Sequence, residues 1–172
     1  MIGGIYINIV KLKKDLKTIE RHPVKVLGKD YRVKIIYKNV KVAELNVEED
    51  TIKIILQNKF KKVSNEQMLD FAIQKMYNEI AKVEIERSME KMRIMLGFAP
   101  EDYMIKRINS LGKCEDKNII VNPDIVMYGR EVIDYVVLKQ YCHLKYKTNC
   151  KKYFELLEKY CKNYKKFEKL GL

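Results

Sequence analysis

The sequence lacks tryptophan, has only two histidines, and contains no apolar run long enough to cross a bilayer, which would take ~20 residues. A membrane-spanning protein is therefore not expected. The apolar stretch at residues 2–10 comes before the first group of lysines, whereas a secretory signal places its positive charges ahead of the apolar segment. We accordingly predict a cytoplasmic protein with no membrane partner.

Cysteine, glycine and proline are scarce as well. Seven glycines and three prolines in 172 residues exclude collagen-like and low-complexity proteins. The four cysteines all lie in the last third of the chain and form no CxxC pair: Cys114, Cys142, Cys150 and Cys161. This pattern predicts neither a disulfide-stapled domain nor a classical structural zinc site. Two histidines are also too few for most hydrolytic metal sites.

Positive charge, in contrast, is abundant, with 35 Lys and Arg against 23 Asp and Glu and a net charge of +12. Residues 139–172 hold 10 lysines and 3 glutamates, a net charge of +7. Two interpretations stay open for this Lys-rich C-terminal region. Interleaved lysine and tyrosine side chains could follow a nucleic-acid backbone, or the lysines could form the solvated face of amphipathic helices.

The N-terminal half predicts β-structure followed by a helix. Between residues 24 and 57, β-branched and charged residues alternate with period two, which is typical of half-buried strands. We expect strands near 24–27, 31–37, 41–47 and 51–57, arranged as an antiparallel meander with one face in water. A long helix then begins with Ser64 as N-cap and ends at Gly97. Because it is long for a small domain, a break near Val83–Glu86 is plausible.

Short strands and further helices complete the pattern. We predict strands at 102–108 and 118–121, a buried apolar helix at 131–144, and a last helix over about 150–169. Strands that precede helices indicate the α+β class. We expect one domain over residues 1–172, with a β-rich part at about 1–60, a helical part at about 64–172, and a C-terminal pair of helices.

Five segments in the second half match the motifs of a known family. They are Leu111–Cys114, Asn118–Asn122, Asp134–Leu138, Cys142–Lys145 and Tyr153–Leu157. In these segments the chain resembles the metallopeptidase domain of the YgjP-like family, whose relatives are the SprT-type zincins. Their counterparts there are a WGSC signature, a short strand with an Asn, a metal-binding helix of the form DYVVxHELxHL, and a helix that opens with an aromatic pair. The resemblance covers about residues 24–169 and implies a zincin-like fold.

The zinc site that the resemblance implies is degenerate in this sequence. In an HExxH helix, the two histidines bind zinc and the glutamate acts as general base on the bound water. The corresponding residues here are Lys139, Gln140 and His143, and the position of the third ligand falls on Asn149. An ammonium group cannot coordinate zinc, glutamine cannot accept a proton near neutrality, and an asparagine amide is a poor zinc ligand. We therefore expect no catalytic residue, no metal and no other cofactor at this site.

Two alternatives and one preferred interpretation concern the same neighbourhood. A rebuilt zinc site could use His143, Cys150 and Cys114, a mixed nitrogen and sulfur set that suits this metal. Cys150 with His143 could act as a metal-free nucleophile and base. The interpretation that we prefer is that the Lys139 amine replaces the lost zinc ion and forms hydrogen bonds with Gln140 and Asn149.

The leading functional hypothesis is a catalytically degenerate metallopeptidase-family protein that binds or regulates a protein or peptide. A zincin cleft holds its substrate as an added strand, which is why a peptide is a candidate partner. The first alternative is an active, metal-dependent peptidase with altered ligands. The second is a nucleic-acid-associated protein that uses the Lys-rich C-terminal region.

Overall fold

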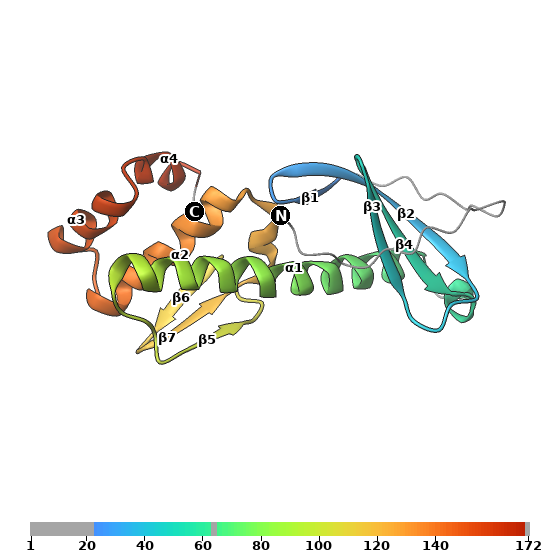
Figure 1. Ribbon diagram of the computed structural model, residues 1–172, viewed down its shortest axis with the longest axis horizontal. Coiled ribbons are helices and arrows are strands. Elements are labelled where there is room, and N and C mark those ends of the chain that lie inside the picture. Colours follow the sequence, from blue (N-terminus) through green and yellow to red (C-terminus); the bar gives the residue numbers. More distant parts are fainter. Residues whose placement is uncertain (1–22, 63–64, 171–172) are drawn as a thin grey trace. The chain divides into compact units, whose positions relative to one another are not determined.

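The computed structural model describes residues 23–62 and 65–170 (Figure 1). It divides into two units, which we describe separately. Among the described residues, the first unit consists mainly of Asp30–Ile73, and the second contains Lys25–Lys29 together with the chain from Gln74 onward. The expected N-terminal cap at Ser64 and residues 1–22 of the expected β-rich part lie outside the described residues.

The first sheet has four strands, β1 (Val24–Val26), β2 (Lys29–Lys38), β3 (Glu44–Glu48) and β4 (Thr51–Gln57), in the order β1-β2-β4-β3. This order corrects the expected meander, because β4 pairs with β2 in parallel and with β3 antiparallel. Burial explains the difference. Ile54, Ile55 and Leu56 of β4 are consecutive and all buried, so both faces of this strand are covered and it takes a central position. The β3 side chains are exposed or half-buried, as suits an edge strand.

The helix α1 (Asn65–Leu96) follows the short helix η1 (Asn58–Lys62) and is continuous over 32 residues. The break that we considered near Val83–Glu86 does not occur. Ile85 is fully buried, and Glu84 is 5% exposed. Gly97 ends the helix as predicted, with a φ of 75° that favours glycine.

The second sheet has three strands in the order β5-β7-β6, namely β5 (Asp102–Ile105), β6 (Gly112–Glu115) and β7 (Asn118–Val121). The central strand β7 is parallel to β5 and antiparallel to β6. It matches the predicted strand at 118–121, whereas β6 was not predicted. Within the described residues, β5 and β6 each have one neighbouring strand and form the edges of this sheet.

Four helical segments follow, namely η2 (Pro123–Met127), α2 (Arg130–Lys145), α3 (Lys151–Tyr160) and α4 (Tyr164–Glu168). The predicted last helix is thus two helices, α3 and α4. The predicted buried helix is α2, and eight of its 16 residues are buried. The hydroxyl group of Tyr141 on α2 donates a hydrogen bond of 3.0 Å to the carbonyl oxygen of Met89 on α1. The α+β class is confirmed, and no helix of residues 23–62 and 65–170 is both long and apolar enough to cross a membrane.

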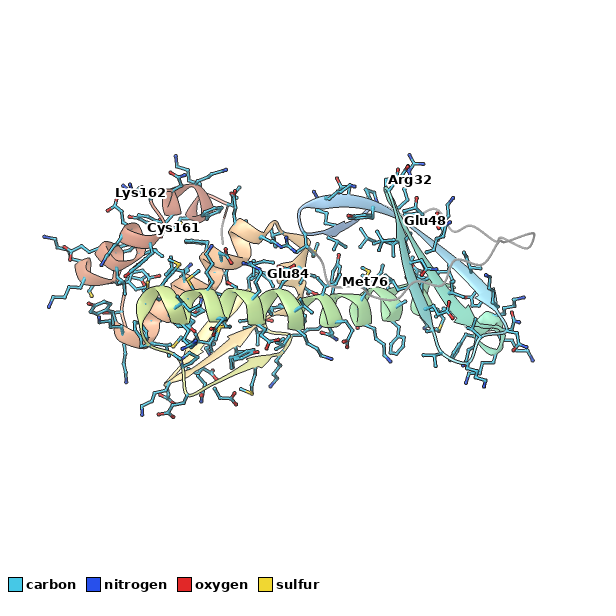
Figure 2. All side chains as sticks on the ribbon, in the orientation of Figure 1. Arg32, Glu48, Met76, Glu84, Cys161 and Lys162 are labelled. Atoms are coloured by element: carbon cyan, nitrogen blue, oxygen red, sulfur yellow. The ribbon has the colours of Figure 1, made fainter. Side chains whose placement is uncertain are left out.

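An ionic cluster also joins α1 to α2. The carboxylate of Glu84 (labelled in Figure 2) accepts hydrogen bonds from Arg130 at 2.6 Å and from Arg87 at 3.0 Å. Arg87 also donates to Asp134 at 2.8 Å, and Lys91 donates to the other oxygen of Asp134 at 2.7 Å. The first half of α2 is therefore held to α1 by charge-assisted hydrogen bonds as well as by apolar packing.

Candidate functional site

The second unit contains a cavity of about 940 Å³ beside α2. One wall is the face of α2, and another is the segment that runs into β6. The remaining lining residues come from the β6–β7 turn, from η2 and its flanks, and from the chain after α2 and α4. The α2 wall consists of Val136, Lys139, Gln140 and His143, and the β6 wall consists of residues 109–114.

Helical spacing explains why three of the predicted site residues meet in this cavity. Residues that are three, four and seven positions apart lie on one face of a helix. Lys139, Gln140 and His143 all line the cavity. Gln140 is 5% exposed, whereas Lys139 and His143 are half-buried. Lys139 and Gln140, which stand where the resembled motif has its first zinc ligand and its general base, thus lie on the same cavity wall as His143.

His143 is held by the residues that follow it. Its ring lies against the ring of Tyr153 on α3, with 4.6 Å between the centroids. Its Nδ1 atom is 3.3 Å from the carbonyl oxygen of Tyr146. Burial lowers the pKa of His143, the Tyr146 carbonyl opposes this shift, and the charge of Lys139 lowers the pKa further. The lowered pKa favours the neutral imidazole, whose Nδ1–H can donate a hydrogen bond to the Tyr146 carbonyl oxygen.

β6 contacts α2 closely at Gly112. A Cβ atom at this position would lie 2.9 Å from Cγ1 of Val136 and 3.3 Å from Cγ and Nε2 of Gln140. The absence of a side chain therefore makes room for the Gln140 amide beside the strand. No other residue in the described part of the chain forms a hydrogen bond with this amide, although the side chain is almost entirely buried.

Other polar groups of the cavity wall are used within the fold. The side-chain amide of Asn122 donates to the carbonyl oxygen of Ile108 at 2.7 Å, and its oxygen accepts from the backbone N–H of Asp124 at 3.0 Å. The carboxylate of Asp124 pairs with Arg107 at 3.1 Å. Lys113 on β6 forms an ion pair with Glu115. These contacts fix the walls and neutralise part of their charge.

The remaining candidate residues do not all reach the cavity. Cys114 lines it, and burial together with the charge of Asp116 raises the pKa of this thiol. Asn149 and Cys150 are both exposed, and neither is among the described residues that line the cavity. The structure therefore brings His143 and Cys114 to one cavity but places Cys150 and Asn149 outside it.

The α2 wall of the cavity offers few of the groups that bind zinc. Its α2 wall offers one ammonium group, one primary amide and one imidazole, whereas zinc sites use several imidazole, thiolate or carboxylate ligands. Across residues 23–62 and 65–170, no three His, Cys, Asp or Glu side chains converge closely enough to bind a metal ion. The buried thiol of Cys142 offers no reactive alternative, since burial raises its pKa to about 12.

Several cavity residues had no signal in the sequence, and Lys147 and Asp116 are two charged examples. Lys147 lies in the chain after α2, and Asp116 lies in the β6–β7 turn with a φ of 52°. Neither belongs to a periodic pattern or to a motif of the resembled family. A β6–β7 hairpin prediction could have placed Asp116 near the site, because asparagine and aspartate tolerate a positive φ.

Among the comparisons with known proteins, the family model agrees with the motifs. No curated protein matches the chain significantly. A crystal structure of the metallopeptidase zymogen of Pyrococcus abyssi abylysin is similar over 44% of this chain and 77% of that chain, with 20% sequence identity and a TM-score of 0.40. The family described as YgjP-like, metallopeptidase domain, matches residues 7–170, nearly the whole chain. The chain therefore belongs to the YgjP-like family, the family that its sequence motifs resemble.

Proposed function

We propose that this YgjP-like protein binds peptide segments in the cavity between α2 and β6 without hydrolysing them. One observation carries the proposal, namely that Lys139 and Gln140 stand on the cavity-facing side of α2. Hydrolysis by a zincin needs a metal and a general base at these positions. The ammonium group of Lys139 repels a metal cation, and the amide of Gln140 has no proton-accepting form near neutrality.

The edge position of β6 supports a peptide as the partner. This strand pairs with β7 on one side, in a register that joins Gly112 to Val121 and Glu115 to Asn118. Because β6 is a sheet edge in the described chain, its other side can accept an extended peptide as an added strand. Residues 112–114 of this strand also line the cavity. Backbone hydrogen bonds along β6 would hold the peptide, and the cavity would receive one of its side chains or its end.

Metal content and peptidase activity test the proposal together. We expect protein purified without chelator to contain much less than one zinc per chain by elemental analysis, and to leave a denatured-protein substrate intact in added zinc. The variant His143→Ala should behave in the same way as the wild type in both assays. Stoichiometric zinc and hydrolysis, both lost in His143→Ala, would instead support the active hydrolase with altered ligands.

The Lys-rich C-terminal region favours a second candidate, nucleic-acid binding. Seven lysines of residues 151–169 are exposed, and among them Lys162 is labelled in Figure 2. Exposed Glu155, Glu158 and Glu168 offset part of this charge. The surplus could contact phosphate groups, in which case the affinity would fall steeply with salt.

A salt titration tests this second candidate. Binding of a fluorescent DNA duplex would be measured between ~50 and 200 mM salt, where counterion release has a large effect. Reversing the charge of Lys165 and Lys166 should weaken the binding, whereas the same change at Lys61 and Lys62 on η1 serves as the matched control. Absence of binding at the lowest salt concentration would leave these lysines as a solvated helix face.

A further inference from the structure

A second cavity, of about 690 Å³, lies within the second unit. One wall is the second half of α1, another is the segment 99–103 that leads into β5, and Tyr141 of α2 completes the lining. We call this cavity the α1–β5 groove. Among the described residues, it shares no lining residue with the cavity between α2 and β6. Its volume lies in the range of ligand-binding pockets, ~300–1,000 Å³.

Apolar side chains form part of the α1–β5 groove. Met89 and Tyr141 are almost fully buried, and the Tyr141 hydroxyl group already donates to the Met89 carbonyl oxygen at 3.0 Å. Val83, in contrast, is 66% exposed, and Tyr103 is half-buried. A single exposed valine is ordinary on a protein surface, but Val83 and Tyr103 line the same groove. A ligand that covers both would be stabilised, because it removes apolar surface from water.

Charged residues also line the groove, and four of the six are already paired. The six are Glu86, Arg87, Glu90, Arg93, Glu101 and Asp102. Arg87 belongs to the ionic cluster between α1 and α2. Arg93 forms two hydrogen bonds with Glu90, at 2.6 and 2.7 Å. Glu101 forms an ion pair with Lys117.

The other two charged residues, Glu86 and Asp102, keep an unneutralised negative charge. Glu86 on α1 is exposed and has no ion-pair or hydrogen-bond partner among the described residues. Asp102 at the start of β5 accepts a hydrogen bond of 2.8 Å from the backbone N–H of Tyr103, a neutral donor. Each of the two walls thus carries one unneutralised carboxylate, in a chain whose net charge is +12. The ligand that complements this groove carries a positive charge next to an apolar part.

A lysine or arginine side chain combines these two properties. Its aliphatic stem can lie on apolar surface while its charged head stays at the rim. The planar guanidinium group of arginine can in addition stack on an aromatic ring and bind a carboxylate with two hydrogen bonds. A metal ion fits less well, because hard cations need several converging oxygen ligands, and no three acidic or other metal-binding side chains converge in the described part of the chain.

We propose that the α1–β5 groove binds a basic segment of a partner protein. An arginine or lysine side chain of this segment pairs with Glu86 and Asp102, and an apolar residue next to it covers Val83 and Tyr103. The site is separate from the cavity between α2 and β6, so this inference does not depend on the function proposed for that cavity.

Four peptides that differ at one residue test the inference on the full-length protein. The first is N-acetyl-Gly-Leu-Arg-Leu-Gly-amide, and the others have lysine, citrulline or glutamate in place of the arginine. Citrulline keeps the shape of arginine but lacks its charge. Affinities would be measured by NMR titration at ~50 mM salt, because higher salt screens exposed charges.

We expect the arginine peptide to bind about three- to tenfold more tightly than the citrulline peptide, a modest preference because ion pairs with exposed carboxylates are weak. The glutamate peptide should bind most weakly. The double variant Glu86→Gln and Asp102→Asn should remove the preference for arginine, and the asparagine oxygen can still accept the hydrogen bond from Tyr103. Glu158→Gln is the matched control, because Glu158 is exposed on α3 and lines neither cavity.

The apolar contact has its own pair of variants. Val83→Ser should weaken the binding of all four peptides by about threefold, because less apolar surface is then buried. Ile94→Ser is the control, since Ile94 is 69% exposed on the same helix but does not line the groove. Equal losses of affinity in the two variants would overturn the apolar contact at Val83.

The peptide series decides the remaining questions. Equal affinities of the arginine and citrulline peptides would overturn the inference, as would a preference that persists in the double variant or the absence of any binding at millimolar concentration. A lysine peptide that binds like the arginine peptide supports recognition of positive charge alone, and one that binds like the citrulline peptide supports recognition of the guanidinium group. Self-association of the protein that the double variant abolishes would assign the groove to the Lys-rich C-terminal region of a second copy and overturn the partner protein.

Discussion

Replacing Gly112 by alanine tests the close contact between β6 and α2. The added Cβ atom would lie 2.9 Å from Cγ1 of Val136, whereas carbon atoms in contact are ~3.5–4.0 Å apart. Val136 is 2% exposed, so its side chain has little room to move away. Two atoms of Gln140 would lie 3.3 Å from the same Cβ. The substitution therefore overfills a packed boundary between a strand and a helix.

The size of the effect follows from two opposing contributions. Overpacking of this kind costs about 1–3 kcal/mol. Alanine also restricts the unfolded chain, which stabilises the folded state by about 0.4–1 kcal/mol. We expect a net loss of about 1–2 kcal/mol in the free energy of unfolding, the difference between these contributions. Urea denaturation followed by circular dichroism would measure it, together with weaker peptide binding if Gln140 is displaced.

Two further variants decide whether the contact is the cause. Gly129→Ala is the control, because a Cβ there meets nothing within 4 Å. Gly129 is also the N-cap of α2. Alanine is a poorer N-cap than glycine but restricts the unfolded chain more, so the two effects offset each other and we expect the free energy of unfolding to change by no more than about 0.5 kcal/mol. Val136→Ala should lower the free energy of unfolding less in the Gly112→Ala background than in the wild type, because it relieves the overpacking. The difference, which is the coupling energy of the two changes, should be about 1–2 kcal/mol. A Gly112→Ala protein that is as stable as the wild type, with no coupling to residue 136, would refute the reasoning.

Three more predictions concern the second unit. Glu84→Gln should destabilise the fold by about 2–3 kcal/mol, less than a fully buried ion pair because its arginine partners are partly exposed. Hydrogen bonds from these arginines lower the pKa of Glu84. The ionised carboxylate therefore stabilises the fold at neutral pH, and this stabilisation is lost as the pH falls below ~4. A Glu84→Gln protein whose stability falls as steeply with acid as that of the wild type would contradict this. Tyr135→Phe should leave urea stability unchanged or raise it by up to about 1 kcal/mol, because the buried hydroxyl group has no hydrogen-bond partner in the described chain; a loss would indicate a partner. The double change Lys139→His and Gln140→Glu would give two imidazoles at i and i+4 with His143, so added zinc should raise the Tm of this variant and not that of the wild type.

The sequence was sufficient where a pattern is local. The apolar spacing of Ile133, Val136 and Val137 predicted α2 to within one residue at each end. The run Asn118–Val121 was predicted as the strand that became β7. Both elements are buried, and burial imposes a hydrophobic pattern that can be read without knowledge of the neighbours.

The strand pairings could not be predicted in the same way. Gly112–Glu115 has no apolar alternation, and it forms β6 only because β7 offers it a partner. The parallel pairing of β2 with β4 likewise depends on contacts distant in the sequence. Consecutive strands often pair with each other, which is why the sequence favours a meander. In the structure β4 lies next to β2, and the exposed strand β3 takes the edge of the sheet.

The same distinction applies to the candidate site. Lys139, Gln140 and His143 were expected together and do line one cavity, because a single helix fixes their spacing. Asn149 was expected beside them but is exposed, since α2 ends at Lys145 and no periodicity governs the following loop. Helical geometry predicts which side chains of α2 lie together, but it says nothing about residues beyond the end of the helix, such as Asn149.

The rate at which the buried thiol of Cys142 is alkylated can report how often the core of the second unit opens. With a side chain that is fully buried and a pKa raised to about 12, it cannot react with an alkylating reagent while α2 stays packed. Cys150, at the N-cap of α3, is exposed and should be alkylated at once. Mass spectrometry of peptides after timed alkylation would therefore show an immediate modification at Cys150 and a slow one at Cys142, with the half-buried Cys114 and Cys161 between them. The rate of the slow modification measures how often α2 opens, and a bound peptide that bridges α2 and β6 should slow it further.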